Sequence, residues 1–300
     1  KIMDQYGADI LRLWVATTDY SGELNISNEI IKRVADSYRR IRNTLRFLSA
    51  NLEDFDSKNM IIKPKEMLSI DRYGLYLVEE LQNNVIKDYE SFDFYLAMQK
   101  FLSFCSEDMG GFYLDILKDR LYTTAENSHA RRSAQTALFH ITQSLIRLMA
   151  PVLSFTAEEL WSVINKENKN TIFIESWYKL PSHDLSRKEL LGWSHVLNVR
   201  NLANKKIEAL REQGVVGSSL QAELKISAPS DIYNSLSFFD TELKYILITS
   251  NSILEESKNS LEVEVTASKN NKCERCWHYV EDIGQNSKHP EICKRCISNL

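Results

Sequence analysis

The chain has 300 residues, of which 43% are hydrophobic and 26% are charged, and its formal net charge at pH 7 is −4. The length predicts about two domains, and the composition is typical of a soluble globular protein. The slightly negative charge excludes a generic polyanion binder, so any nucleic-acid surface must come from local segregation of charge. Arg147 and Pro151 interrupt the longest apolar stretch, near residues 138–155, and we therefore expect no membrane span.

No signal peptide is recognisable, and we expect a cytoplasmic monomer with reduced cysteines. The chain begins at Lys1 and enters a helical pattern at once, so we expect a fragment of a longer protein. Cys105 lies among Phe101, Leu102 and Phe104 and is predicted to be a buried apolar residue rather than a nucleophile.

The first predicted elements are a short helix over residues 8–16 and a long helix that Ser27 or Asn28 can cap. Apolar residues recur every three or four positions along the long helix, which predicts one face packed in a bundle. They are Val34, Tyr38, Ile41, Leu45, Leu48 and Leu52.

Basic residues gather on a different face of the long helix. At about 100° per residue, four side chains fall together. These are Lys32, Arg39, Arg42 and Arg46. No acidic residue lies between Arg39 and Arg46. The pattern is equally consistent with a solvated helix face and with a phosphate-binding stripe, so both interpretations remain open.

Further helices are predicted near residues 73–89, from residue 94, over residues 112–122 and from residue 131 to a stop before Pro151. Gly110 and Gly111 predict a break between the second and third of these. The last helix has one apolar face, made by Leu138, Ile141, Leu145 and Leu148, and His140 on it is expected to be a satisfied core or boundary histidine.

One more helix is predicted after Pro151. Thr156 and Glu159 have the spacing of a capping box, and Phe155 and Leu160 that of a hydrophobic staple. Successive helices joined by short loops predict an antiparallel bundle, so the fold class is mainly α.

The composition changes after Trp177. A linker over residues 181–186 leads to a helix that should end at Gly214, and alternating residues predict strands over 220–226, 245–248 and 261–267. This pattern predicts a small α/β domain. It contains no Gly-rich phosphate loop, no acid pair at a catalytic spacing and no Ser/His/Asp signature.

The chain ends in two C-x-x-C pairs, Cys273 with Cys276 and Cys293 with Cys296. This spacing matches the template of a four-cysteine zinc site, and four thiolates close the coordination shell, so we predict one structural Zn²⁺. Two disulfides are disfavoured because nothing else in the chain suggests secretion. His278 and His289 lie between the pairs, and we expect them to be surface histidines beside a complete site.

Basic side chains around the cysteines only slightly outnumber acidic ones, and four thiolates on one Zn²⁺ offset that excess. Nucleic-acid recognition there would need the placement of Arg275 and Arg295 rather than bulk charge. Trp277 follows the second cysteine, and its ring either covers the zinc site or stacks on an unpaired base. Covering the site is the favoured interpretation.

Taken together, these stretches resemble the bacterial isoleucyl-tRNA synthetases, which are class I aminoacyl-tRNA synthetases. The most specific matches are YGADILRLW at residues 6–14, YRRIRNT at 38–44, YLDILKDR at 113–120, MAPVLSFTAEE at 149–159, and the CERCWH segment that opens the finger at Cys273. The related synthetases for valine and leucine share the helical domain but do not end in this finger.

The resemblance implies four regions. Residues 1–26 would be the tail of the catalytic core, 27–180 the helical anticodon-binding domain, 181–268 an α/β C-terminal junction domain and 269–300 the zinc finger. The chain would bind the anticodon stem-loop of an isoleucine tRNA, with contacts expected from Lys32, Arg39, Arg42, Arg46, Arg275, Trp277 and Arg295.

The resemblance also implies that the full-length enzyme is an isoleucine–tRNA ligase that uses ATP. Both active-site signatures of the family, HIGH and KMSKS, are absent from the sequence, as is the editing domain, so we expect this chain alone to be inactive. Three alternatives stay open: the finger of a formamidopyrimidine-type DNA glycosylase, the anticodon domain of another class I synthetase, or a zinc-stapled scaffold that binds only protein.

Overall fold

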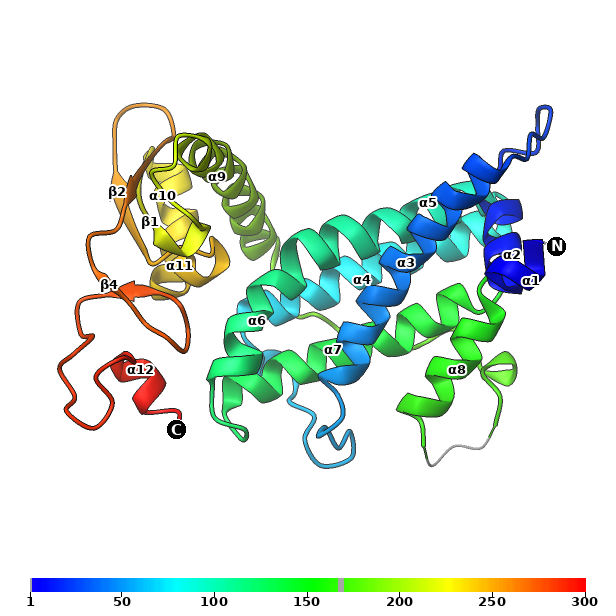
Figure 1. Cartoon of the computed structure of the whole chain (residues 1–300), viewed down its shortest axis with the longest axis horizontal. Coiled ribbons are helices and arrows are strands. Elements are labelled where there is room, and N and C mark those ends of the chain that lie inside the picture. Colours follow the sequence, from blue (N-terminus) through cyan, green and yellow to red (C-terminus); the bar gives the residue numbers. More distant parts are fainter. Residues whose placement is uncertain (1, 167–169) are drawn as a thin grey trace. The chain divides into compact units, whose positions relative to one another are not determined.

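The computed structural model describes residues 2–166 and 170–300 (Figure 1). The chain divides into two compact units. Unit 1 comprises Lys1–Asp115 and Arg132–Asp184, and unit 2 comprises Ile116–Arg131 and Leu185–Leu300. The predicted mainly α fold, with a bundle, a small α/β part and a four-cysteine end, is confirmed.

Unit 1 is a bundle of helices. In chain order it contains the helices α1 (Ile2–Tyr6), α2 (Ala8–Thr17), α3 (Asn28–Ala50), α4 (Ser69–Glu90), α5 (Phe94–Ser103), η2 (Phe104–Tyr113), α7 (His129–Met149) and α8 (Ser154–Ile164). Helix α7 is buried on nearly all sides, since 16 of its 21 residues are buried. It therefore lies at the centre of the bundle. Its predicted face of Leu138, Ile141, Leu145 and Leu148 is fully buried.

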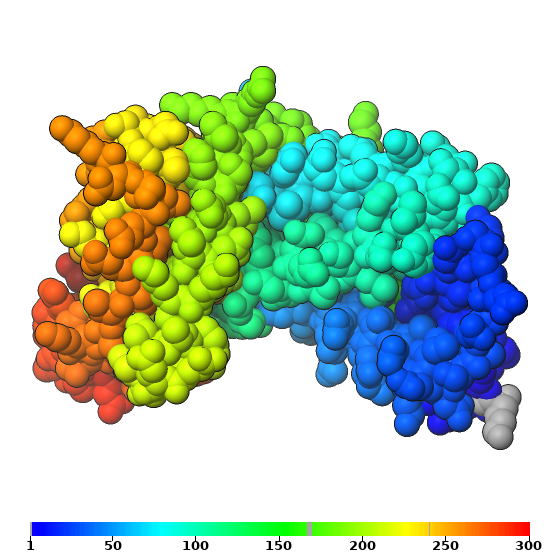
Figure 2. All heavy atoms as spheres, turned by 90° about the horizontal axis from the view of Figure 1, so that it is seen from above, coloured from blue at the N-terminus to red at the C-terminus, as the bar shows by residue number. Residues whose placement is uncertain are grey.

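Helix α3 begins where the sequence predicted. The Ser27 hydroxyl accepts a hydrogen bond from the Ile30 amide at 3.2 Å, which satisfies one of the unpaired amides at the helix start. Ile41, Leu45 and Leu48 on its predicted apolar face are buried. Figure 2 shows α3, in blue, at the surface of unit 1, so the face of α3 opposite its apolar face is exposed to solvent.

The predicted break at Gly110 and Gly111 is wrong. Helix α5 continues without interruption through η2, a π-helix, into α6 (Leu114–Thr123). A β-carbon added at Gly110 would lie 3.3 Å from the Cys105 carbonyl oxygen, five residues earlier. The missing side chains let the backbone turn more widely here, and a wide turn is the defining feature of a π-helix.

The predicted capping box at Thr156 and Glu159 is also wrong. Helix α8 begins at Ser154, two residues earlier, so Thr156 lies inside its first turn. The Asp9 carboxylate on α2 accepts hydrogen bonds from the Phe155 and Thr156 amides, at 3.2 and 2.8 Å. A side chain distant in sequence therefore caps this helix, and Phe155 is 68% exposed rather than packed as a staple.

Unit 2 contains a three-stranded sheet and the helices that cover it. Helix α9 (Arg187–Glu212) starts with a capping box between Ser186 and Glu189, and Gly214 follows its end with a positive φ of 71°. The strand order is β2 (Asn251–Glu256), β1 (Ala222–Ala228), β3 (Glu262–Ala267), with β1 parallel to β2 and antiparallel to β3. The short helices α10 (Ser230–Leu236), η5 (Ser237–Glu242) and α11 (Leu243–Ile246) lie between β1 and β2 in the chain.

The strand predicted over residues 245–248 is wrong, because Tyr245 and Ile246 end helix α11 and Leu247 and Ile248 form the turn after it, with φ of 56° at Ile248. Its four apolar residues are too few to distinguish a strand from a buried helical turn. The finger completes unit 2 with β4 (Asn271–Lys272), β5 (Tyr279–Val280) and α12 (Lys294–Ile297). No helix among the described residues has the length and apolar character needed to cross a membrane.

Candidate metal centre and nucleic-acid interface

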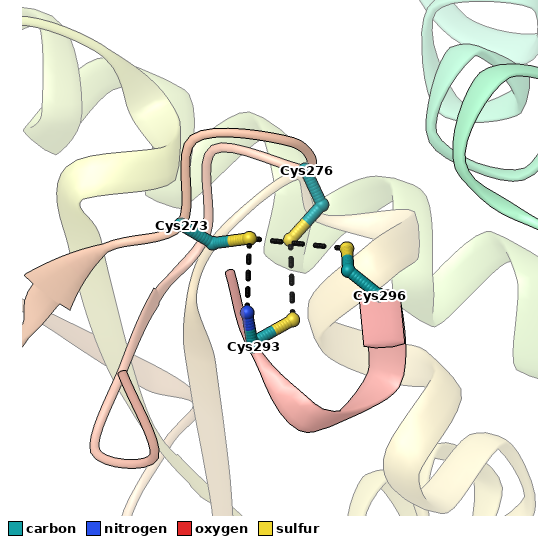
Figure 3. A group of neighbouring side chains, drawn as sticks. All are labelled: Cys273, Cys276, Cys293 and Cys296. Carbon is teal, nitrogen blue, oxygen red and sulfur yellow. Dashed lines mark hydrogen bonds between the residues drawn. The ribbon is translucent and has the colours of Figure 1, made fainter. Parts of the chain in front are cut away.

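The four cysteines of the finger point their thiols at one another (Figure 3). Cys273 and Cys276 lie on the loop that follows β4, and Cys293 and Cys296 flank the start of α12. All four sulfur atoms lie within 4.8 Å of one another, and all four residues are buried. They form the core of the finger, and the partly buried Val280, Ile283 and Ile292 pack against them.

The spacing of the sulfur atoms fits tetrahedral zinc. With Zn–S bonds of about 2.3 Å, the sulfur atoms of a regular tetrahedron lie about 3.8 Å apart. The Cys273 and Cys296 sulfurs are 3.8 Å apart, and those of Cys276 and Cys293 are 3.7 Å apart. All five cysteines of the chain are free, so the disulfide alternative is absent from this structure.

Burial acts against the thiolate forms of these cysteines. Burial raises the pKa of the Cys276 thiol to about 11 and raises that of Cys296 further. Burial acts on Cys273 in the same direction, but amide hydrogen bonds, first from Cys276 and then from Cys293, bring its pKa down to about 7. A divalent cation at the centre would stabilise all four thiolates together.

The two histidines near the cluster are not among its ligands. His289 is exposed, as predicted. His278 is buried at 5% exposure, so its predicted surface position is wrong. Its ring packs edge-on against Tyr245 with centroids 5.4 Å apart, and its Nδ1 lies 3.3 Å from the Cys276 carbonyl oxygen.

The two arginines of the finger have partners within unit 2. Arg275 is half-buried and its Nη2 donates to the Asn299 carbonyl oxygen at 3.1 Å. Arg295 donates through both terminal nitrogens to the two carboxylate oxygens of Asp119, each at 2.6 Å. Its guanidinium also lies over the Tyr245 ring, 5.0 Å from the centroid.

Trp277 presents its ring to solvent. Its side chain is 59% exposed, and the Lys272 ammonium lies 5.2 Å from the ring centroid. Its backbone has φ of 65°, in the left-handed region that favours glycine. Exposed aromatic rings beside a cation are suited to stacking on nucleobases.

The basic residues predicted to form a stripe on α3 are all exposed, and two are already paired. Arg39 pairs with Asp36 one turn earlier, and Arg42 Nη2 lies 2.9 Å from Glu159 Oε1 of α8. Neither Lys32 nor Arg46 has a charged partner in the part of the chain that the structure describes. We name Lys32, Arg39, Arg42 and Arg46 the α3 stripe.

Comparisons with known proteins assign the chain to a family. The family described as "Anticodon-binding domain of tRNA ligase" matches residues 71–226. The chain belongs to this family. A second family, described as "Zinc finger found in FPG and IleRS", matches residues 270–299, which include all four clustered cysteines.

Curated relatives match along the whole of this chain. The "Isoleucine--tRNA ligase" of Cupriavidus pinatubonensis (strain JMP 134 / LMG 1197) is 51% identical over 100% of the chain and 32% of the relative. That of Ralstonia pickettii (strain 12J) is 50% identical with the same coverage. The chain thus spans about a third of the length of the curated relatives it matches.

A weaker likeness is to the "Crystal structure of the ternary complex of Agrobacterium radiobacter K84 agnB2 LeuRS-tRNA-LeuAMS". It has 19% identity and a TM-score of 0.44, over 60% of this chain and 20% of that chain. This TM-score is too low to establish a shared fold.

Three acidic partners in this chain were missed by sequence reasoning. Asp9 caps α8, Glu159 pairs with Arg42, and Asp119 pairs with Arg295, at separations of 147, 117 and 176 residues. No local pattern marks such pairs. By contrast, His140 and Cys105 have their predicted roles, since both are buried and the His140 ring bonds to the Tyr178 hydroxyl at 2.8 Å.

Proposed function

We propose that this chain is the tRNA-binding part of an isoleucine–tRNA ligase and that it holds the anticodon stem-loop. One observation carries the proposal: a chain about half identical to isoleucine–tRNA ligases along its whole length contains both an anticodon-binding domain and a four-thiol finger. The full-length ligase would use ATP, act as a monomer and work in the cytoplasm. The proposed regions remain residues 1–26, 27–180, 181–268 and 269–300.

The metal belongs to the same proposal. One Zn²⁺ would be held by Cys273, Cys276, Cys293 and Cys296, with no open position for water or substrate. When bound, the ion would join the two C-x-x-C pairs and stabilise the fold of the finger. Arg275 and Trp277 would then lie at the surface of the finger, where they can contact RNA.

On α3 we propose that the unpaired members of the stripe contribute most. Lys32 and Arg46 can bind phosphate without first losing an internal ion pair. Arg39 and Arg42 would have to exchange a carboxylate for a phosphate, which reduces the net gain from each contact. We therefore rank Arg46 and Lys32 above Arg39 and Arg42.

The test is tRNA binding by single alanine variants across a series of salt concentrations. Each lost phosphate contact should make the slope of log K against log salt shallower by about 0.7–0.9. Arg46→Ala and Lys32→Ala should show this change with the thermal stability unchanged. Arg39→Ala and Arg42→Ala should change affinity less.

Arg33→Ala is the matched control on the same helix. Arg33 is exposed and pairs with Glu29, but it lies off the stripe, so its loss should leave affinity and slope at wild-type values. Wild-type slopes for both Arg46→Ala and Lys32→Ala would show that the stripe is a solvated face. Preference for duplex DNA over tRNA at one salt concentration would instead favour the glycosylase alternative.

A further inference from the structure

We propose that Asp119 is a positioning residue, through which the metal-binding finger holds the segment Ile116–Arg131 in the place that tRNA binding requires. This inference rests on the proposed function for its RNA part. Its structural part, a link between metal binding and the 116–131 segment, stands on contacts within unit 2 alone.

The central contact is the paired hydrogen bond between Arg295 and Asp119. Both N–O distances are 2.6 Å, and the two side chains are only 30% and 16% exposed. A two-pronged arginine–carboxylate contact fixes direction as well as distance, and partial burial reduces its screening by salt. Such a contact is suited to holding two segments in register.

A second contact runs beside the first. The Asn299 side-chain oxygen accepts from the Ala125 amide at 2.8 Å, and its side-chain nitrogen donates to the Arg295 carbonyl oxygen at 2.8 Å. Asn299 thus links Ala125, in the turn of the 116–131 segment, to Arg295, which binds Asp119.

The position of Arg295 in turn depends on the metal site. Arg295 lies between Cys293 and Cys296 in the four-residue helix α12, and the cysteines themselves make up most of the finger's core. A helix this short has almost no stability of its own. Without the metal, α12 would lose the core that fixes its backbone, and the packing of the Arg295 guanidinium on Tyr245 would not by itself set the position of the helix.

The 116–131 segment is also internally braced. Arg131 donates to the Leu121 carbonyl oxygen, and Arg120 donates to that of Ala130 at 3.3 Å, so the two sides of its turn are tied together. A braced segment moves as one piece, and fixing Asp119 and Ala125 therefore fixes the whole segment, including the exposed ring of Tyr122.

The geometry indicates that Arg295 binds Asp119 rather than a phosphate of the RNA. Its two terminal nitrogens already donate to Asp119, so its contribution to RNA binding would be indirect. The two roles predict opposite effects of removing Asp119. Loss of a positioning partner weakens binding, whereas loss of a competitor frees Arg295 and strengthens it.

The experiment compares Asp119→Asn, Arg295→Gln, the double variant and the charge-swapped Asp119→Arg/Arg295→Asp variant in the whole chain. The first readout is hydrogen exchange at the Ala125 amide, with zinc bound and after chelation. We expect exchange to be about tenfold faster or more in either single variant and in the chelated wild type, within the range of strongly coupled neighbours. The double variant should be no faster than the singles.

The second readout is tRNA affinity against salt. Both single variants should bind more weakly by a similar factor with an unchanged salt slope, and the charge swap should restore part of the loss. The matched control pair is Glu208–Arg211 on α9, which is exposed, and Glu208→Gln should alter neither readout.

Three outcomes would overturn the inference. They are unchanged Ala125 exchange in both single variants and after chelation, a shallower salt slope for Arg295→Gln alone, and tighter tRNA binding by Asp119→Asn. If the wild-type chain bound no tRNA, the proposed function would fail, while the exchange experiment would still decide the link between metal and segment.

Discussion

The Asp9 carboxylate on α2 binds the first turn of α8 through Thr156, accepting from its amide at 2.8 Å and from its hydroxyl at 2.6 Å. Asp9 is 7% exposed and Thr156 is 5% exposed, so these bonds are shielded from water. The Thr156 hydroxyl also lies 2.9 Å from that of Tyr38 on α3. Three helices of unit 1, α2, α3 and α8, therefore meet in one polar contact.

Asp9→Ala should destabilise unit 1, because the Phe155 and Thr156 amides lose their acceptor and the Thr156 hydroxyl loses one of its two partners. We expect a loss of about 1–3 kcal/mol in the free energy of unfolding, measured by denaturant titration. Glu29→Ala removes an equally negative but exposed side chain of α3 and should change stability by less than about 0.5 kcal/mol. Equal effects of the two variants would refute the capping role of Asp9.

Removing the metal should unfold the finger and leave the bundle intact. Elemental analysis of protein purified under reducing conditions should find one zinc per chain, because the four sulfurs form a single cluster. After chelation, exchange protection should disappear from the finger while helices such as α7 keep theirs.

Cys273→Ala should abolish stoichiometric zinc, while Cys105→Ala should retain it, since Cys105 lies in the bundle and is 1% exposed. Protein without zinc that kept a protected finger would contradict a structural metal.

Acid should destabilise unit 1 through His140. Burial lowers the pKa of this residue from 6.5 to about 4. The folded state holds the ring neutral, so its contribution to stability is complete above pH 6.5 and is lost as the pH falls towards 4. In that window the free energy of unfolding should fall by up to about 1.4 kcal/mol per pH unit from this one group.

The pH dependence of unfolding should be shallower in His140→Gln than in wild type between pH 6.5 and 4. His129→Gln serves as the control because His129 is exposed at the start of α7. If His140→Gln and wild type lost stability in parallel, another group would be responsible.

Trp277→Gly should separate the two interpretations of this side chain. Glycine adopts a φ of 65° without strain, so the variant should hold zinc at least as well as wild type if the ring only serves RNA. Its tRNA affinity should fall, since stacking on one base contributes about 1–3 kcal/mol. A lower zinc affinity in Trp277→Gly would show instead that the ring covers the metal site.

Local signals in the sequence predicted local structure well. Ser27 caps α3, Gly214 follows the end of α9, and the two C-x-x-C pairs converge, because each depends on residues a few positions apart. The strand predicted over residues 245–248 failed because a run of four apolar residues carries no usable period. Strand β2 was missed because it lies at the sheet edge and buries no residue fully.

The metal ligands of the candidate site could be predicted from the sequence, but the acidic partners of its arginines could not. The spacing of Cys273, Cys276, Cys293 and Cys296 is a local property, whereas the partners of Arg42 and Arg295 come from segments more than a hundred residues away. The absence of acidic residues between Arg39 and Arg46 suggested a free stripe. Glu159 is remote from Arg42 in the sequence but close to it in space, and only the fold shows that Arg42 already forms an ion pair with Glu159.

The π-helix η2 bears on how this chain can change length over evolutionary time. A π-helical turn contains more residues than an α-helical turn, so Phe104–Tyr113 stores surplus residues within an unbroken helix. A deletion inside this stretch, for example of Gly111, could be absorbed by tightening part of the stretch to α geometry. The faces that Phe101 and Leu117 present on either side would then keep their phase, whereas the same deletion within α7 would rotate every later residue of that helix away from its packing partners.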